Sequence, residues 1–405
     1  MSAPAATQTT AHDSVKKIPL ALCLGIAACM AAAHLGINYT PYLVGGLIDR
    51  FGFGPGSMGV FATAETLSFA IAMFLFAPRA QTLRPRRMAL IASAIIALVQ
   101  VGAAATGVLP LLVISRVATG FGYGMLNTAV NVAAARTGQP ARAISVGISL
   151  QVLLFMVMNL TIPMIGASGG VGAMFIALGI ISGALALGMV PLSDTTETGV
   201  RETGMGTAAA AVPPIAPGGW PVLAAMALFA FGTMAIWPFM ERAAHAIGMS
   251  ATAFGRYQSI SNLLSSAGNF ALTMLLARGI RRGFLEVALL VCGITCAMLT
   301  TVNNQVVFAV ALQLYNVSWY IVYPLLLGLA YTHDPHGRLA VRTTGTWLVA
   351  QSAGSLAAGF VAQVTKGYGL VGGLGMVTCA MAVVIVIRFQ AGKRAEEMLV
   401  VLPAH

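Results

Sequence analysis

The sequence predicts an all-α membrane protein with about twelve transmembrane helices in two pseudo-symmetric six-helix bundles, and three observations support this. Only 8% of the residues are charged and the mean hydropathy is +0.87, whereas a soluble domain carries about 25% charged residues. About twelve apolar segments are each close to the ~20 residues that a helix needs to cross a ~30 Å hydrocarbon core. The two halves of the chain also repeat weakly at a nearly fixed offset. We therefore expect a multi-pass protein whose environment is the lipid bilayer.

The apolar segments follow one another with short polar or basic breaks. In chain order, we expect spans at residues 18–43, 57–77, 88–107, 110–134, 143–166, 171–192, 219–240, 252–277, 284–302, 305–330, 342–364 and 369–390. A secretory signal peptide competes for the first of them, because Ala31–Ala33 offers small residues for cleavage. The run is too long for the apolar region of a signal peptide and has a counterpart in the second half, so we favour an uncleaved span.

Composition divides the chain into regions. The break between the sixth and seventh spans is polar and rich in Pro and Gly, which suits a flexible linker. We expect a disordered cytoplasmic N-terminus at 1–17, an N-terminal six-helix bundle at 18–192, a cytoplasmic linker at 193–218, a C-terminal six-helix bundle at 219–390 and a cytoplasmic tail at 391–405.

Matching positions recur in the two halves at offsets of 195 to 197 residues. The matches are Asn38–Leu43 with Ala235–Met240, Gly59 with Gly255, Arg86-Arg87 with Arg281-Arg282, and Pro140 with Pro335. Each match is weak alone, but together they indicate two parallel repeats of six helices. Transporters built from such repeats bind their substrate near the midplane, between the two halves.

Most basic residues fall on one side of the predicted membrane. With a cytoplasmic amino terminus, only Arg50, Arg242 and Lys366 of the 22 Lys and Arg residues lie on the outer side, and Arg116 and Arg256 lie within spans. The positive-inside rule then places both termini in the cytoplasm. The same distribution explains the net charge of +11, so we expect no nucleic-acid partner.

One arginine lies inside a span beside three glycines. The segment LVISRVATGFGYG has the spacing Leu112-x3-Arg116-x3-Gly120-x-Gly122-x-Gly124. Glycines at this spacing let a neighbouring helix approach closely. The pattern resembles the fourth-helix motif of the major facilitator superfamily. That resemblance implies a secondary transporter of the inner membrane that works by alternating access.

Two other segments depart from the pattern of that superfamily. The loop Pro78–Arg87 keeps its basic cluster, but Gln81 or Thr82 stands where the family has an acidic residue. The loop therefore lacks the acidic member of its usual charge relay. The fifth span lacks the Gly-Pro pair typical of drug/proton antiporters, which weakens the interpretation as an exporter.

Three ionisable side chains are predicted at a similar depth in the membrane. At 1.5 Å per residue, Glu65 and Arg116 lie about 9–12 Å below the outer boundary, and His34 lies close to the same level. A buried carboxyl group or an imidazole can bind and release protons. Our hypothesis is that Glu65 carries the coupling proton, with Arg116 as its modulator or as the binder of an anionic substrate. The alternatives are a structural Glu65–Arg116 pair and a His34 that is only hydrogen-bonded.

Uncharged polar and aromatic residues predict where the substrate binds. In the superfamily, the first, fourth, seventh and tenth helices line the pathway, and the resemblance implies that polar residues of these helices and of the eleventh meet there. Together with His34 and Arg116, the candidates are Asn38, Tyr42, Asn127, Asn131, Trp237, Gln313, Tyr315, Asn316, Trp319, Tyr320, Trp347 and Gln351. Aromatic faces with amide and hydroxyl groups suit a planar or amphipathic organic molecule. The alternative for Trp237 is an interfacial aromatic belt.

These observations favour proton-coupled symport of a small organic anion, an aromatic acid being the preferred class. The closest alternative is proton-driven efflux of amphipathic compounds or drugs. An enzyme is not expected, because no cluster of Cys, His and carboxylate residues supplies a catalytic centre. The five cysteines indicate neither a disulfide framework nor a zinc site. We expect no cofactor, no metal and a monomer.

Overall fold

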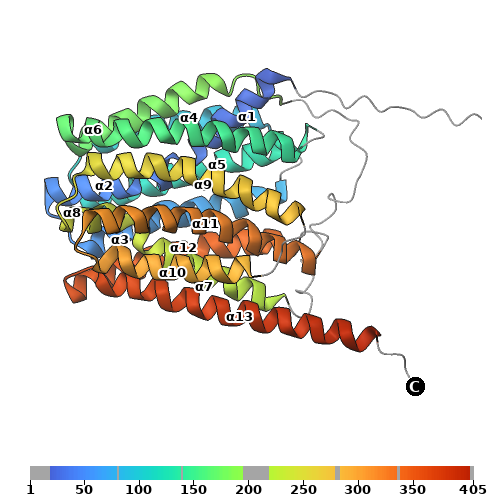
Figure 1. The fold of residues 1–405 in the computed structure, drawn as a ribbon. Helices are drawn as coiled ribbons and strands as arrows, with labels where there is room; N and C mark the ends of the chain where they lie inside the picture. Colours follow the sequence, from blue (N-terminus) through green and yellow to red (C-terminus); the bar gives the residue numbers. More distant parts are fainter. Residues whose placement is uncertain are drawn as a thin grey trace, which may run out of the picture.

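The computed structural model describes residues 19–79, 82–137, 140–194, 219–278, 283–334 and 338–401, and all regular secondary structure in these ranges is helical. The N-terminal half contains α1 (Leu20–Ala33), α2 (Leu35–Phe51), α3 (Pro55–Phe76), α4 (Pro85–Ala104), α5 (Leu109–Ala135) and α6 (Pro140–Gly188). The C-terminal half contains α7 (Trp220–Ile236), α8 (Met240–Ala246), α9 (Ala251–Ala277), α10 (Phe284–Thr301), α11 (Gln305–His333), α12 (Arg338–Thr365) and α13 (Gly369–Val401). The long helices lie side by side as a bundle (Figure 1).

The helices account for the predicted membrane spans. Within the described ranges, ten helical segments are long and apolar enough to cross a membrane, including Val146–Gly188 in α6. That segment holds both the fifth and the sixth predicted span, and α9, which is not among the ten, corresponds to the eighth. With these two additions the ten segments match the twelve that the sequence predicts, and the all-α prediction is confirmed.

The first span is interrupted at His34 and is longer than predicted. His34 has φ −111° and ψ 4° and separates α1 from α2. The predicted end near Leu43 was wrong, because α2 continues to Phe51. It stops at Gly52, whose φ of 67° is the left-handed conformation that ends many helices. The extra turns carry Asp49 to the other half of the molecule.

Helix α6 reverses direction at Gly170. This residue has φ 68° and ψ −172°, a backbone conformation available essentially only to glycine. A Cβ placed on Gly166 would lie 2.8 Å from the sulfur of Met174. Residues eight apart in a straight helix are separated by about 12 Å, so this contact requires the chain to fold back. The two arms of α6 are the separate fifth and sixth spans that the sequence predicts.

The glycines beside Arg116 let α5 pack closely against two neighbours. A Cβ on Gly120 would collide with the Glu65 backbone, and one on Gly124 would lie 2.5 Å from the Phe69 carbonyl oxygen, both on α3. Gly122 points to α4 instead, where Ile96 Cγ1 would lie 2.7 Å from its Cβ. The spacing of the motif thus serves two helix contacts at once, as small residues do in membrane helices.

The basic loop before α4 finds its acidic partner outside the loop. Asp194, which follows α6, accepts the backbone N–H groups of Arg86 and Arg87 at 2.8 and 3.4 Å. A carboxylate stabilises a helix N-terminus because it offsets the positive end of the helix dipole. The acidic position that the loop itself lacks is therefore compensated from the end of the sixth span.

The two ends of the bundle differ in their connections. At one end, which we call the distal end, the connections are short: 52–54, 105–108, 247–250, 302–304 and 366–368. It is the left-hand end in Figure 1. The other, proximal end carries Leu20 and the two longest connections, those between α3 and α4 and between α6 and α7. Many arginines occur at helix ends there, as the charge distribution predicts: Arg79, Arg84, Arg86, Arg87, Arg136, Arg278 and Arg338.

The two halves meet through two matching pairs of helices. On one side α3 packs against α12, where a Cβ on Gly59 would lie 2.9 Å from the Cα of Gly359. On the other side α9 packs against α6, and a Cβ on Gly255 would lie 2.7 Å from Cγ of Pro163. Gly59 and Gly255 are the positions that match in the sequence repeat. The repeat therefore predicts the pseudo-symmetry of the fold.

The ends of the chain are described only in part. Helix α13 runs to Val401, so the region predicted as a tail at 391–405 begins within a helix. The predicted N-terminus at 1–17 and residues 195–218 of the predicted linker lie outside the described residues.

Candidate functional site

A buried ion pair lies inside the N-terminal half. Arg116 on α5 donates from Nη1 to Glu65 Oε2 on α3 and from Nη2 to Gln100 Oε1 on α4, both at 2.6 Å. Thr119 donates to the same Glu65 oxygen at 3.3 Å, and Gln100 donates to the Tyr123 hydroxyl at 3.2 Å. The predicted proximity of Glu65 and Arg116 is present, and the pair belongs to a network that joins three helices.

Aromatic rings enclose the guanidinium of this pair. Arg116 Cζ lies 5.0 Å from the ring centroid of Phe61 and 5.3 Å from that of Phe175, within the range of cation–π attraction. The side chains of Arg116 and Glu65 are 0% and 1% exposed, so the arginine offers no surface to a substrate in this conformation. Glu65 Oε1 has no hydrogen-bond partner among the described residues. That free oxygen is where a proton could bind.

His34 lies close to the ion pair but does not join it. Its Nδ1 bonds to the Met30 carbonyl at 2.9 Å, and its ring packs edge-on against Phe69 at 6.2 Å. Because a carbonyl oxygen only accepts, Nδ1 carries the proton in this contact and Nε2 is left as an acceptor. Gly36, two residues on, is adjacent to Glu65 Oε1. The three ionisable residues thus occupy one layer, as predicted.

The other predicted residues of the N-terminal half bond within that half. The Asn38 amide donates to the His34 carbonyl at 2.8 Å, and the Tyr42 hydroxyl donates to Asn159 Oδ1 at 3.0 Å. The Asn127 amide contacts the sulfur of Met73 at 3.3 Å, and Asn131 is exposed.

Three predicted residues on α11 are paired inside the C-terminal half. Gln313 accepts from Ser261 at 2.8 Å and donates to the Tyr257 carbonyl at 3.0 Å. The Tyr315 hydroxyl donates to the Thr233 carbonyl at 2.8 Å. Asn316 donates to the Leu312 carbonyl at 2.9 Å and accepts from Gln258 at 3.3 Å. Their polar groups are therefore engaged in joining α11 to α7 and α9.

The three remaining aromatic residues that were predicted on α11 and α12 belong to an aromatic cluster. Trp319 stacks on Tyr323 at 5.6 Å with an interplanar angle of 3°. Tyr320 lies edge-on to Trp319 at 5.4 Å, and Trp347 of α12 lies edge-on to Tyr323 at 5.4 Å. Phe229 of α7 closes the group at 6.0 Å from Trp319. We call these five residues the aromatic cluster.

Polar atoms in and beside the aromatic cluster are buried without partners. Among the described residues, no hydrogen-bond partner is found for Trp319 Nε1, for Trp347 Nε1, or for either amide atom of Gln351. Gln351 is 0% exposed and lies one helical turn after Trp347. A buried unpaired polar group costs about 1–3 kcal/mol. Buried polar groups without partners are uncommon in folded proteins, so these four atoms make the region a candidate site.

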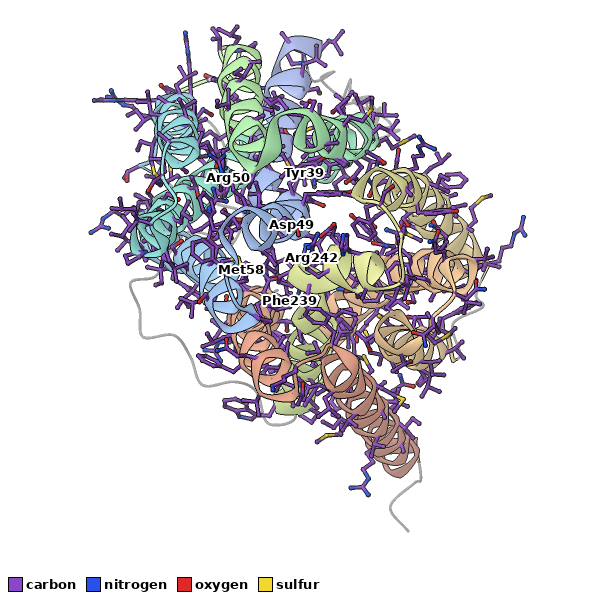
Figure 2. The ribbon with its side chains drawn as sticks, turned by 90° about the vertical axis from the view of Figure 1, so that its left-hand side faces the viewer. Tyr39, Asp49, Arg50, Met58, Phe239 and Arg242 are labelled. Atoms are coloured by element: carbon purple, nitrogen blue, oxygen red, sulfur yellow. The ribbon has the colours of Figure 1, made fainter. Side chains whose placement is uncertain are left out.

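The two halves are clamped together at the distal end. Trp237 donates from Nε1 to the Ile37 carbonyl at 2.7 Å. That carbonyl is free because Pro41, four residues on, has no N–H to donate to it. Arg242 pairs with Asp49 of the other half at 2.6 and 3.1 Å, and with its neighbour Glu241 at 2.7 and 3.0 Å. Figure 2, viewed along the bundle, shows Asp49 and Arg242 facing each other near its centre.

The sequence analysis did not identify several residues that the structure places in these contacts or beside them. Tyr39 is fully buried, and its hydroxyl has no partner within the described part of the chain. It stacks on Tyr42 at 6.2 Å, so the spacing of the two tyrosines on one helix was an available signal. Nothing in the sequence paired Asp49 with Arg242, which lie 193 positions apart. Tyr323, which stacks on Trp319, is not among the site residues that the sequence predicts.

A match to the model of a protein family identifies the class of protein. The model of the Major Facilitator Superfamily matches residues 22–359, which is most of the chain. The chain belongs to the Major Facilitator Superfamily. It is therefore a multi-pass membrane transporter of small molecules and not an enzyme. As a superfamily member, it carries the fourth-helix motif on α5, where the glycines and Arg116 make the contacts described above.

Solved superfamily transporters share the fold over nearly the whole chain. A point mutant of the nucleoside transporter NupG aligns with a TM-score of 0.71 and 12% identity, covering 92% of this chain and 99% of that one. A mutant of the peptide transporter POT aligns with a TM-score of 0.70 and 12% identity, covering 91% and 94%. A bacterial homologue of the human lysosomal transporter Spinster, inward-facing and occupied, gives 0.63 and 14%, covering 92% and 94%. No curated protein sequence matches the chain.

Proposed function

We propose that this transporter moves a small aromatic organic anion by proton-coupled alternating access, as a symporter of the inner membrane with both termini in the cytoplasm. The observation that carries the proposal is the aromatic cluster with its unpaired N–H donors. Flat rings and buried donors are complementary to an aromatic molecule that carries an acceptor group. Two similar structures are named as transporters of nucleosides and of peptides, which are also small organic molecules.

Alternating access requires contacts between the halves that can break and re-form. The bonds from Trp237 to Ile37 and from Arg242 to Asp49, which we call the distal clamp, are such a set, because they join the two halves. Asp49 is 58% exposed at its side chain, so water can replace its partner when the halves separate. If the basic proximal end is cytoplasmic, this structure is closed toward the outside. The Spinster homologue, which shares the fold, is described as inward-facing.

For the proton, Glu65 is the candidate carrier within the described residues. Its carboxylate is buried, is held by Arg116 on one oxygen and is free on the other. Protonation would weaken its bond to Arg116 and release the guanidinium toward Gln100. Because Arg116 already bonds to Gln100, the change would leave Gln100 as its main partner and would couple the charge of Glu65 to the packing of α3 against α5.

The test is uptake into proteoliposomes with an imposed inward proton gradient, using labelled benzoate and phenylacetate, with propionate as the aliphatic comparison. We expect gradient-driven accumulation of the aromatic acids that is lost in Glu65→Gln. It should be kept in the matched control Glu286→Gln, which changes a carboxylate in the first turn of α10. Full activity of a folded Glu65→Gln protein would remove Glu65 as the carrier. Absence of uptake, with resistance of expressing cells to toxic amphipathic compounds, would favour efflux instead.

A further inference from the structure

Gln351 is the most unusual polar residue of the C-terminal half. Its side chain is completely buried on α12, and neither its carbonyl oxygen nor its amide nitrogen has a partner among the described residues. The neighbouring Ser352 and Ser355 are both paired, to Thr66 and to the Met234 carbonyl. Gln351 thus lacks partners on a helix whose other buried polar side chains nearby have them.

Trp347 lies on the same face of α12 as this amide, and its ring contacts that of Trp319. Trp347 is one turn before Gln351, and side chains in a helix lean toward its N-terminus, so the amide is directed toward the indole. The ring of Trp319 lies 6.2 Å from that of Trp347. An indole nitrogen only donates, so the two tryptophans cannot satisfy each other. The group therefore offers donors from three side chains and one acceptor.

A surplus of donors selects a ligand rich in acceptors. A carboxylate has two oxygens and about four lone-pair sites and accepts several N–H bonds at once. The faces of Tyr323 and Phe229 beside the donors suit the flat apolar part of the same molecule. Hydrogen bonds from several N–H donors to a carboxylate are charge-assisted and offset part of the cost of burying it.

We propose that the substrate carboxylate binds to Trp319 Nε1, Trp347 Nε1 and the Gln351 amide, and that Arg116 does not hold it. This inference rests on the proposed transport of an aromatic anion and specifies where its charged group sits. Arg116 is already bonded to Glu65 and Gln100 and is fully buried. The assignment places the anion site in the C-terminal half and the buried ion pair in the N-terminal half.

The experiment is equilibrium binding of benzoate, phenylacetate and 3-phenylpropionate to the purified full chain, compared with their uncharged amides. We expect the carboxylates to bind at least about tenfold more tightly than the amides. Trp319→Phe and Trp347→Phe replace each indole with a smaller aromatic ring that has no N–H group, and each should weaken carboxylate binding about tenfold or more. Gln351→Leu should do the same, while amide binding changes less.

The control is Trp220→Phe, a variant at an indole that is exposed at the start of α7 and is expected to leave binding unchanged. Size-exclusion profiles show whether each variant is folded. Equal carboxylate affinity in wild type and in the three folded variants would overturn the inference, and so would binding of the amides alone. Uptake of an uncharged aromatic compound without carboxylate binding would overturn the inference while leaving transport intact. Failure of all uptake would overturn the proposed function itself.

Discussion

The two halves carry different polar chemistry at matching positions. Adding the repeat offset of 196 to Glu65 gives Ser261, and an offset of 197 takes Arg116 to Gln313. In the N-terminal half these positions form an ion pair at 2.6 Å, and in the C-terminal half they form a hydrogen bond at 2.8 Å between Ser261 and Gln313. One backbone repeat therefore supports a charged network in one half and a neutral network in the other.

The difference has an energetic meaning. Two buried charges lose their hydration, and their attraction offsets this cost only while both partners are present. A neutral hydrogen bond contributes less to the stability of the fold, about 1 kcal/mol. The N-terminal half is thus sensitive to a change in the charge of Glu65. The C-terminal half, being neutral, can leave donors open for a ligand without exposing a buried charge.

The largest expected effect comes from removing one member of the ion pair. Arg116→Leu should destabilise the protein by about 3–5 kcal/mol, because Glu65 is left as an uncompensated buried charge. The double variant Glu65→Leu/Arg116→Leu should recover much of that loss, since it buries no charge. Thermal unfolding in detergent, followed by the loss of the monodisperse species, measures both. A single variant as stable as the double would show that the pair is not electrostatically coupled.

A smaller effect is expected at the contact between α3 and α5 beside the ion pair. Gly120→Ala should destabilise the protein by about 1–3 kcal/mol, because the new methyl group collides with the Glu65 backbone and Ser68. At the offset that matches Arg116 to Gln313, Gly120 corresponds to Val317, which carries a full side chain, so Val317→Ala should be tolerated better. Thermal unfolding of the two variants tests this asymmetry. Equal losses would mean that α3 and α5 can separate more easily than their packing indicates.

The distal clamp should respond more modestly. Asp49→Asn weakens a partly exposed pair worth about 1 kcal/mol or less, which corresponds to a change of up to about fivefold in the closed population. Spin labels on cysteines placed at Phe53 and Asn303 would report the separation of the halves at this end, because the native cysteines are all buried. The variant should show a larger share of long distances. An unchanged distribution would mean that Trp237 and the α3–α12 contacts hold this end alone.

A similarly small effect is expected at the neutral counterpart of the ion pair. Ser261→Ala removes one hydrogen bond to Gln313 and should cost about 1 kcal/mol, with transport retained. Thermal unfolding and uptake are measured on the same preparation. A loss as large as that of Arg116→Leu would contradict the proposed contrast between the halves.

Local patterns in the sequence were sufficient to predict the fold. Apolar length predicts each span because the thickness of the bilayer sets it, and a charge inside a span marks Arg116 because such a charge is costly. The match of Gly59 with Gly255 anticipates the two interfaces between the halves. The end of the first span was predicted incorrectly, because the continuation to Phe51 depends on contacts with the other half: Asp49 with Arg242, and Gly45 with Glu241.

The sequence by itself determined that this chain spans the membrane as two matching bundles and that Arg116 lies inside one of them. It could not separate Tyr315 from Trp319, which are one turn apart on α11 and were both predicted to bind substrate. Only the tertiary structure decided that the Tyr315 hydroxyl reaches the Thr233 carbonyl while the Trp319 nitrogen reaches no partner among the described residues. The physical reason is that periodicity places a side chain on a face of a helix, whereas the pairing of its polar atoms depends on what other helices bring to that face.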